Sequence, residues 1–144
     1  MNGEAFALHP NLEATSAFVA DLELCQARLQ LDARFPWLVL VPRLADVREI
    51  EELSPKDRAT LIEEIAKACA AVRAMAAVMD RAVEKLNIGA LGNVTPQLHV
   101  HVLGRWRSDG LWPNPVWGRG EPRAYEPEVL AEAIRTAAQA LGGS

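Results

Sequence analysis

Cysteine is scarce in this sequence, which has only two cysteines among 144 residues. Cys25 and Cys69 are too far apart for a CxxC motif and too few for a four-thiolate zinc site. A disulfide framework is therefore not expected, and the reducing cytoplasm is the simplest expected setting.

Long apolar runs are also lacking, since no stretch approaches the roughly 20 apolar residues that a membrane-spanning helix needs. The start of the chain, MNGEAFALHP, has neither the charged region nor the long apolar stretch of a signal peptide. Neither a membrane span nor a secretion signal is expected from these patterns.

An excess of basic residues is absent, because 15 Lys and Arg face 19 Asp and Glu for a net charge of -4. Such a balance argues against a basic surface for nucleic acid or for an anionic membrane. A small anionic ligand stays possible, since backbone amides can bind it. With 50% hydrophobic and 24% charged residues, the chain is expected to form one globular domain, residues 1–144.

The first half of the chain predicts a hairpin followed by a long helix. Residues 1–17 look irregular, residues 18–41 are strand-like, and Asp32-Ala33-Arg34 is the expected turn of the hairpin. The apolar run over residues 36–42 predicts a strand buried on both faces.

Ser54 is the expected N-cap of the long helix, with Pro55 in its first turn. The helix is expected to end between residues 79 and 86. Apolar residues at steps of three or four predict its buried stripe, in which Cys69 is expected to pack rather than react. The stripe consists of Ile62, Ile65, Cys69, Val72, Met75 and Met79.

The second half predicts another strand pair, over residues 88–91 and 98–103, with Gly92-Asn93 as its turn. Residues 106–124 contain three tryptophans, which is typical of an ordered loop rather than a linker. Residues 126–141 predict a closing helix, with Gly142 placed as its C-cap. This order of elements predicts an α+β fold with an antiparallel sheet, one long helix and a C-terminal helix.

The segment PQLHVHVLGR places two of the three histidines two residues apart. Alternate residues of a strand share a face, about 6.6 to 6.8 Å apart. Gln97, His99 and His101 should therefore lie on one face of a motif strand over residues 97–103. Leu98, Val100 and Val102 should face the core, which leaves the histidines toward solvent or a cleft.

Three interpretations of the paired histidines remain open from the residues alone. They can be solvated residues of a sheet face. They can be two zinc ligands, which would need His9 or a distant carboxylate as a third ligand. They can also be a nucleophile and a charge-stabilising partner, if an acceptor holds one ring nitrogen of His99 as N–H. His9 itself is isolated in the sequence and is expected at the surface.

Several segments together resemble the histidine triad family of nucleotide hydrolases and transferases. They are LHVHVL preceded by GN, DLELC, DARFPWLVLVPR, KLN and WPNPVWG, and they cover about residues 9 to 120. The resemblance extends to a bacterial branch of the family, similar to diadenosine polyphosphate hydrolases. It implies a HIT-like fold, a homodimer joined through the sheet and the long helix, and a nucleotide substrate cleaved without a metal ion or other cofactor.

The resemblance also assigns roles within the motif. His99 matches the histidine that attacks the α-phosphate, and His101 matches the one that contacts the phosphate or the leaving group. Gln97 stands where the family has its first histidine. Its carbonyl can still hold the imidazole of His99, but its side chain carries no proton at neutral pH. Because acid–base help is typically worth about 10² to 10⁴-fold, a nucleotide-binding module with little catalysis is the competing expectation.

The resemblance further suggests three residues that bind the substrate. Asn93 matches a position near the phosphates, Asn87 matches one that touches the nucleotide or supports the site, and Asp32 lies where the family often holds the ribose. Each also has a plain structural explanation, as a turn residue or a strand cap. Trp112 and Trp117 are expected mainly as structural aromatic residues.

Overall fold

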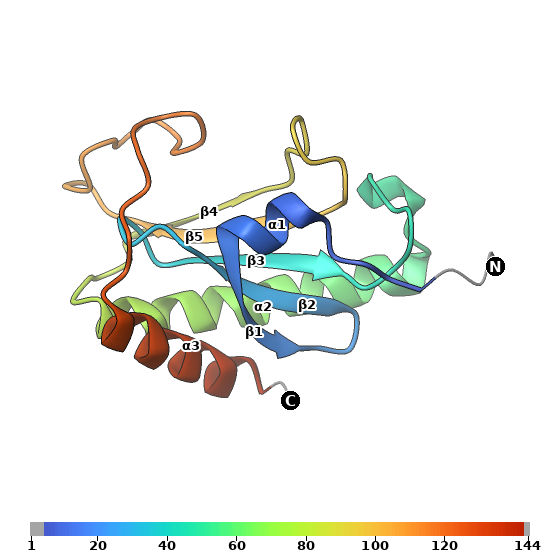
Figure 1. The fold of residues 1–144 in the computed structure, drawn as a ribbon, viewed down its shortest axis with the longest axis horizontal. Coiled ribbons are helices and arrows are strands. Elements are labelled where there is room, and N and C mark those ends of the chain that lie inside the picture. Colours follow the sequence, from blue (N-terminus) through green and yellow to red (C-terminus); the bar gives the residue numbers. More distant parts are fainter. Residues whose placement is uncertain (1–4, 143–144) are drawn as a thin grey trace.

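The sheet is five-stranded and antiparallel throughout, in the order β1-β2-β3-β5-β4. The computed structural model describes residues 5–142, so both ends of the expected 1–144 domain lie outside the described residues. Figure 1 shows the sheet with its helices, and the predicted α+β class is confirmed. The strands are β1 Ser16–Asp21, β2 Cys25–Gln30, β3 Trp37–Pro42, β4 Lys85–Gly89 and β5 Val100–Arg105.

The start of the first long helix and the end of the second lie where their capping residues predict, whereas the first ends at residue 78, one residue before the expected range of 79–86. Helix α2, Pro55–Val78, begins after Ser54, whose hydroxyl accepts a hydrogen bond from the Asp57 N–H at 3.1 Å. Helix α3, Pro127–Leu141, ends at Gly142 in the left-handed conformation at φ 66°. Neither is long and apolar enough to cross a membrane, and the same holds for every helix within residues 5–142.

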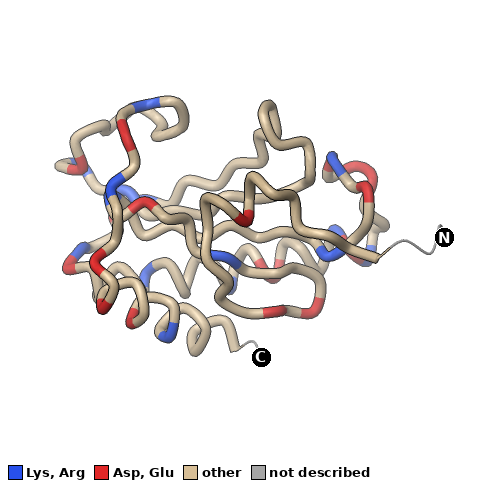
Figure 2. The backbone as a smooth tube through the Cα atoms, viewed as in Figure 1, with Lys and Arg blue, Asp and Glu red and all other residues tan. Residues whose placement is uncertain are grey.

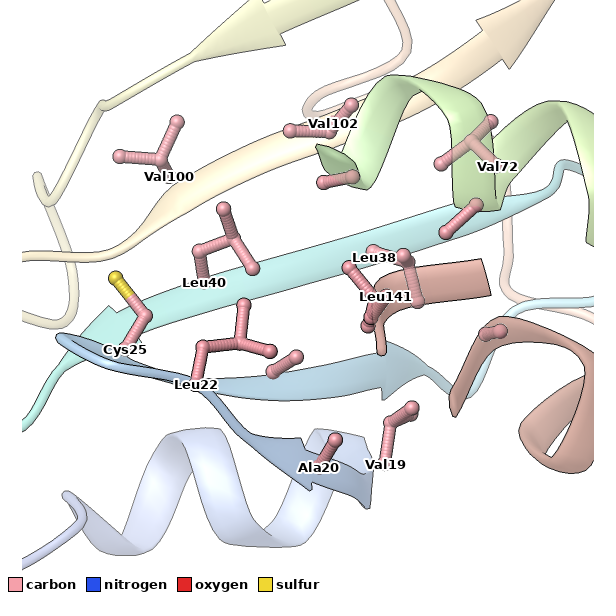
Figure 3. Close-up of a cluster of buried hydrophobic side chains, with 14 of the residues drawn as sticks. Val19, Ala20, Leu22, Cys25, Leu38, Leu40, Val72, Val100, Val102 and Leu141 are labelled. Atoms are coloured by element: carbon pink, nitrogen blue, oxygen red, sulfur yellow. The ribbon is translucent and has the colours of Figure 1, made fainter. Parts of the chain in front are cut away.

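Both long helices pack on one face of the sheet and form the main core with it (Figure 3). The predicted core residues Leu98, Val100 and Val102 belong to this cluster, so the alternation in the motif segment is confirmed. All six residues of β3 are buried, as its continuous apolar run predicts. Charged residues of both signs are interspersed along α2, α3 and the loops (Figure 2).

The opposite face of the sheet carries a second, smaller core. Helix α1, Pro10–Thr15, contributes Leu12 to it, and residues from the loop before β3, from β3 and β5, and from the loop after β5 complete it. Its buried members are Leu12, Phe35, Trp37, Val39, Val41, Leu103 and Val116. Because His99 and His101 alternate with the main-core residues, this second face is the one on which they lie.

The N-terminal quarter is more regular than its sequence predicts. The irregular structure expected over residues 1–17 agrees with residues 5–9, but it is wrong from Pro10 on, where α1 and the start of β1 lie. The expected hairpin is three strands rather than two, because the chain turns between Asp21 and Cys25. The carboxylate of Glu64 on α2 accepts the N–H groups of Leu24 and Cys25, both at 2.9 Å. A distant buried carboxylate stabilises this turn, so no local pattern reveals it.

The predicted stripe of α2 is wrong in its first turns. Ile62 is 62% exposed, whereas Leu61 and Glu64 are buried in its place. The larger apolar side chains predict one buried side of the helix, but the side that is buried also contains alanines, which the predicted stripe left out. Cys69 is half-buried against the main core, which agrees with the packing role expected for it.

The strand pair in the second half is confirmed, but its boundaries differ from those expected. Strands β4 and β5 are joined by residues 90–99 rather than by a two-residue turn at Gly92-Asn93. The motif strand therefore begins at Val100, and the expected span of 97–103 is wrong. Gln97 and His99 lie in the segment that leads into β5, and only His101 is in the strand itself.

Candidate active site

The strand register places His101 in the middle of the second face of the sheet. It pairs with Val39 on β3 and with Gly89 on β4. A Cβ atom at Gly89 would lie 3.1 Å from the ring of Trp117, so a glycine here leaves room for that tryptophan. The loop over residues 106–124 thus brings an aromatic ring over the sheet beside His101.

His99 is held by the backbone of Gln97. Its Nδ1 lies 2.7 Å from the Gln97 carbonyl oxygen, which is the contact expected from the sequence. A carbonyl oxygen can only accept, so Nδ1 carries the proton, and in the neutral imidazole Nε2 then keeps its lone pair. The side chain is 6% exposed, so of the two expected alternatives, solvent or a cleft, open solvent is wrong.

His101 lies beside His99, with ring centroids 5.0 Å apart and ring planes at 74°. Its Nδ1 accepts a hydrogen bond from the indole N–H of Trp37 at 3.0 Å. Burial, and then the neighbouring His99, lower the pKa of His101 to about 4, so its imidazole is neutral at neutral pH. Sequence reasoning missed Trp37, because only the pairing of β3 with β5 brings the two rings together.

Two tryptophans form the aromatic surroundings of His101. The rings of Trp37 and Trp117 each lie 5.6 Å from its ring, and they lie 6.5 Å from each other in an edge-on arrangement. Trp112 is placed elsewhere, with the guanidinium of Arg105 5.8 Å from its ring centroid. The structural role expected for Trp112 agrees with this place, whereas Trp117 is part of the wall of the site.

The backbone and the side chain of Gln97 make different contacts. Its backbone carbonyl contacts His99, while its side chain is bonded to the backbone of the N-terminal segment. The amide oxygen accepts the N–H of His9 at 2.8 Å, and the amide nitrogen donates to the carbonyl of Ala7 at 2.9 Å. His9, expected at the surface, is half-buried and caps α1 through its Nδ1, which accepts the Asn11 N–H at 3.0 Å.

A cavity of about 250 Å³ opens beside His99. Gln97 and Arg48 line it, and both also line a neighbouring cavity of about 380 Å³ beside the N-terminal segment. The two spaces therefore adjoin near the motif. The first is lined by Arg48, Glu49, Ile50, Glu51, Ala90, Leu91, Gly92, Gln97, Leu98 and His99.

The two candidate asparagines occupy different places. Asn87 pairs with Leu103 in the sheet, on the face that carries the histidines, and its oxygen accepts from Arg105 at 3.1 Å. Asn93 is exposed in the 90–99 connection, next to Gly92 of the cavity wall. Asn87 is thus bonded to a neighbouring side chain, whereas Asn93 follows a residue of the cavity wall in the chain without itself lining the cavity.

Asp32 is not brought to the histidines. Its carboxylate is 3% exposed and is bonded to Arg34 and to the N–H of Arg123. Burial raises its pKa, but the hydrogen bonds from Arg34 and Arg123 outweigh burial and hold the pKa below its usual value. A carboxylate engaged in this way closes the loop after β2, and its position gives no support to the expected ribose contact.

The site contains two histidines at close range, and the third histidine, His9, is the N-cap of α1. Within residues 5–142, no three or more side chains of His, Cys, Asp or Glu gather closely enough to hold a metal ion.

The fold and the site define a class of α+β proteins that carry alternate histidines on an antiparallel sheet. The chain belongs to the histidine triad family, because the model of the HIT domain matches residues 11–108. Among proteins with curated descriptions, none matches the chain.

Solved structures support the same assignment. A histidine triad protein from Sinorhizobium meliloti 1021 is 40% identical, with a TM-score of 0.86 over 93% of this chain and 96% of that one. A histidine triad protein from Bradyrhizobium japonicum is 37% identical, with a TM-score of 0.87 over 96% and 99%. A hypothetical histidine triad nucleotide-binding protein from Sulfolobus tokodaii, 16% identical with a TM-score of 0.64 over 92% and 86%, shares the fold.

Proposed function

We propose that this protein is a nucleotide-binding hydrolase or transferase that cleaves a phosphoanhydride or phosphoramidate bond at the α-phosphate of a nucleotide. The observation that carries the proposal is the contact of His99 with the Gln97 carbonyl, which leaves an imidazole lone pair beside a cavity. The Sulfolobus tokodaii relative is described as nucleotide-binding, which supports the choice of ligand.

The reaction proceeds in two displacements at phosphorus. Nε2 of His99 bonds to the α-phosphorus, and the bond to the leaving group breaks with its electron pair, so that the leaving group takes a proton from solvent. The nucleotidyl-imidazole is cationic, and its Nδ1–H is stabilised by the Gln97 carbonyl. Water or another acceptor then attacks phosphorus, the electron pair returns to Nε2, and the attacking group loses its proton to solvent.

The supporting residues follow from their places. His101, neutral and within 5.0 Å of His99 between ring centroids, contacts the phosphate or the leaving group. Asn93, beside the cavity, is proposed as a phosphate contact. Asn87 supports the site through Arg105.

The direct test is intact-mass analysis after brief mixing with a diadenosine polyphosphate or with adenosine phosphoramidate. We expect a transient adduct that carries one nucleoside monophosphate, followed by release of the free monophosphate. Tight nucleotide binding, with no adduct and no turnover on either substrate, would contradict the proposed enzymatic activity. It would favour the competing function, a binding module. The two substrates also test the proposed likeness to diadenosine polyphosphate hydrolases.

The competing binding module is favoured by one specific observation, the engagement of the Gln97 side chain with Ala7 and His9. One N–H of its amide is bonded to Ala7, and an amide, unlike an imidazolium, gives up no proton to a leaving group. If an imidazole at this position is needed for full activity, Gln97→His should raise turnover several-fold. No gain in that variant, together with an adduct in the wild type, would show that solvent protonates the leaving group adequately.

Gln97→Ala should distinguish the role of the side chain of Gln97 from that of its backbone carbonyl. The variant keeps the carbonyl that holds His99 and loses two hydrogen bonds, each worth about 1 kcal/mol. We expect the free energy of unfolding to fall by about 1–3 kcal/mol in urea titrations, with adduct formation changed less than about tenfold. Gln139→Ala, at an exposed position of α3, is the matched control. A loss of adduct formation beyond about 100-fold would instead give the amide a chemical role.

A homodimer through β4 and α2 is part of the proposal. Strand β4 is at the end of the sheet, and Ile88 on it is 49% exposed, near Leu91 at 44% and Val94 at 86%. Ile62 on α2 is also exposed. Exposed apolar side chains along a sheet edge are typical of an association surface.

Sedimentation of the purified protein should give twice the chain mass of 15.7 kDa. Ile88→Lys should shift it toward one chain mass, because it would bury a charge in the interface. Phe18→Lys is the matched control, since Phe18 is 47% exposed on β1 at the other edge of the sheet. A wild-type chain that sediments as a monomer at micromolar concentration would contradict the dimer.

The proposed setting is the reducing cytoplasm. Both cysteines are free, and burial raises the thiol pKa of Cys25 and of Cys69 above the usual value.

A further inference from the structure

The hydrogen bond from Trp37 to His101 also determines which ring nitrogen of His101 carries the proton. An indole N–H can only donate, so the Nδ1 atom that it meets at 3.0 Å must be the unprotonated nitrogen of His101. The proton of the neutral imidazole is then on Nε2. His99 has the opposite arrangement, because the Gln97 carbonyl can only accept and keeps the proton on Nδ1.

We propose that Trp37 is a positioning residue that holds His101 as the Nε2–H tautomer, so that the paired imidazoles present opposite groups to the substrate. His99 offers a lone pair at Nε2, and His101 offers an N–H donor at the same atom of its ring. The inference rests on the proposed function, in which a nucleophile must stand beside a donor to the charged phosphate.

The surroundings of His101 favour the Nε2–H tautomer. Trp37 is 5% exposed and is the first residue of β3, where it pairs with Leu103 and packs in the second core. Protonation of His101 at Nδ1 would set two N–H groups against each other across the Trp37 contact. The same contact therefore opposes the imidazolium form, in line with the lowered pKa of about 4.

No charged side chain contributes to this arrangement among the described groups around His101. His99 is the titratable group that faces it, with centroids 5.0 Å apart. Val39 on β3, Gly89 on β4 and Trp117 from the loop are uncharged. The hydrogen bond donated by the Trp37 indole is thus the contact that makes the two ring nitrogens of His101 different.

The first test reads the tautomers in the free protein by nitrogen-15 NMR of the histidine rings, with His101→Gln used to assign the signals. We expect the Nδ1–H pattern for His99, the Nε2–H pattern for His101, and no titration of His101 between pH 5 and 8. An Nδ1–H pattern or an imidazolium at His101 at pH 7 would overturn the inference. This result does not depend on turnover, so it stands apart from the adduct experiment that tests the proposed function.

The second test is Trp37→Phe, which keeps an aromatic ring and removes the donor. We expect His101 to populate both tautomers, while burial and His99, the causes of its lowered pKa, still keep the pKa below the usual 6.5. Adduct formation should fall by up to about tenfold at both pH 5.5 and pH 8, because part of the population loses the N–H donor at Nε2. Trp112→Phe removes an indole N–H away from the histidines and is the matched control. A loss of adduct formation with the His101 tautomers unchanged would leave Trp37 a packing residue only.

Discussion

Replacing His99 with alanine is expected to abolish the covalent adduct and to reduce turnover by at least about 10³-fold. The variant removes the one imidazole whose free lone pair is fixed beside the cavity. His101 cannot take its place, because its Nδ1 faces the indole N–H of Trp37. The measurements are intact mass after brief mixing with adenosine phosphoramidate, and steady-state release of the monophosphate.

Two further measurements keep this result interpretable. His9→Ala is the control, since His9 caps the short helix α1 and lies outside the cavity that contains His99. Nucleotide affinity of His99→Ala by equilibrium dialysis should stay within about tenfold of the wild type, since the cavity walls remain. An adduct of undiminished amount in His99→Ala would place the nucleophile elsewhere and contradict the proposed mechanism.

The features that the sequence predicts well are those specified within a few residues. Ser54 and Pro55 mark the start of α2, and Gly142 marks the end of α3, because capping is local chemistry. The alternation around His99 likewise places Leu98 and Val100 in the core. The contact of His99 with the Gln97 carbonyl is of the same kind, since only two residues separate its partners.

The features that it does not predict depend on partners far along the chain. The turn between β1 and β2 is stabilised by Glu64, 40 residues beyond Leu24. Trp37 reaches His101 across 64 residues, and only the sheet register reveals the contact. In the sequence, Gln97 only replaces the first histidine of the motif. Its hydrogen bond with the N–H of His9 depends on the folded N-terminal segment, so the sequence does not predict it.

Replacing Asp109 with alanine is expected to cost about 3–5 kcal/mol of unfolding free energy, the usual cost of leaving a buried charge unpaired. Its carboxylate accepts from Arg105 Nε at 2.5 Å, and the two side chains are 2% and 0% exposed. It also accepts the backbone N–H groups of Leu111 and Trp112 at 3.0 and 2.9 Å. One carboxylate therefore holds both a buried guanidinium and the start of the loop that carries Trp117.

The dependence of this effect on pH has a definite sign. Burial raises the pKa of Asp109, but the bonds from Arg105 and from the loop N–H groups outweigh burial and lower it below the usual value. A carboxyl whose pKa is lower in the folded state stabilises the protein above its unfolded pKa of about 3.9. That stabilisation is lost as the pH falls from there through the folded pKa, so the wild type and Asp109→Ala should converge in acid.

Urea titrations of both proteins at pH 7 and at stepped values below pH 4 measure the difference. Asp80→Asn is the control, because Asp80 is exposed and asparagine tolerates its positive φ of 58°. A constant difference at every pH would show that Asp109 acts through packing rather than through its charge. The milder Asp109→Asn links stability to the site: if the loop positions Trp117 against His101, the nitrogen-15 signals of His101 should shift in this variant while those of His9 do not.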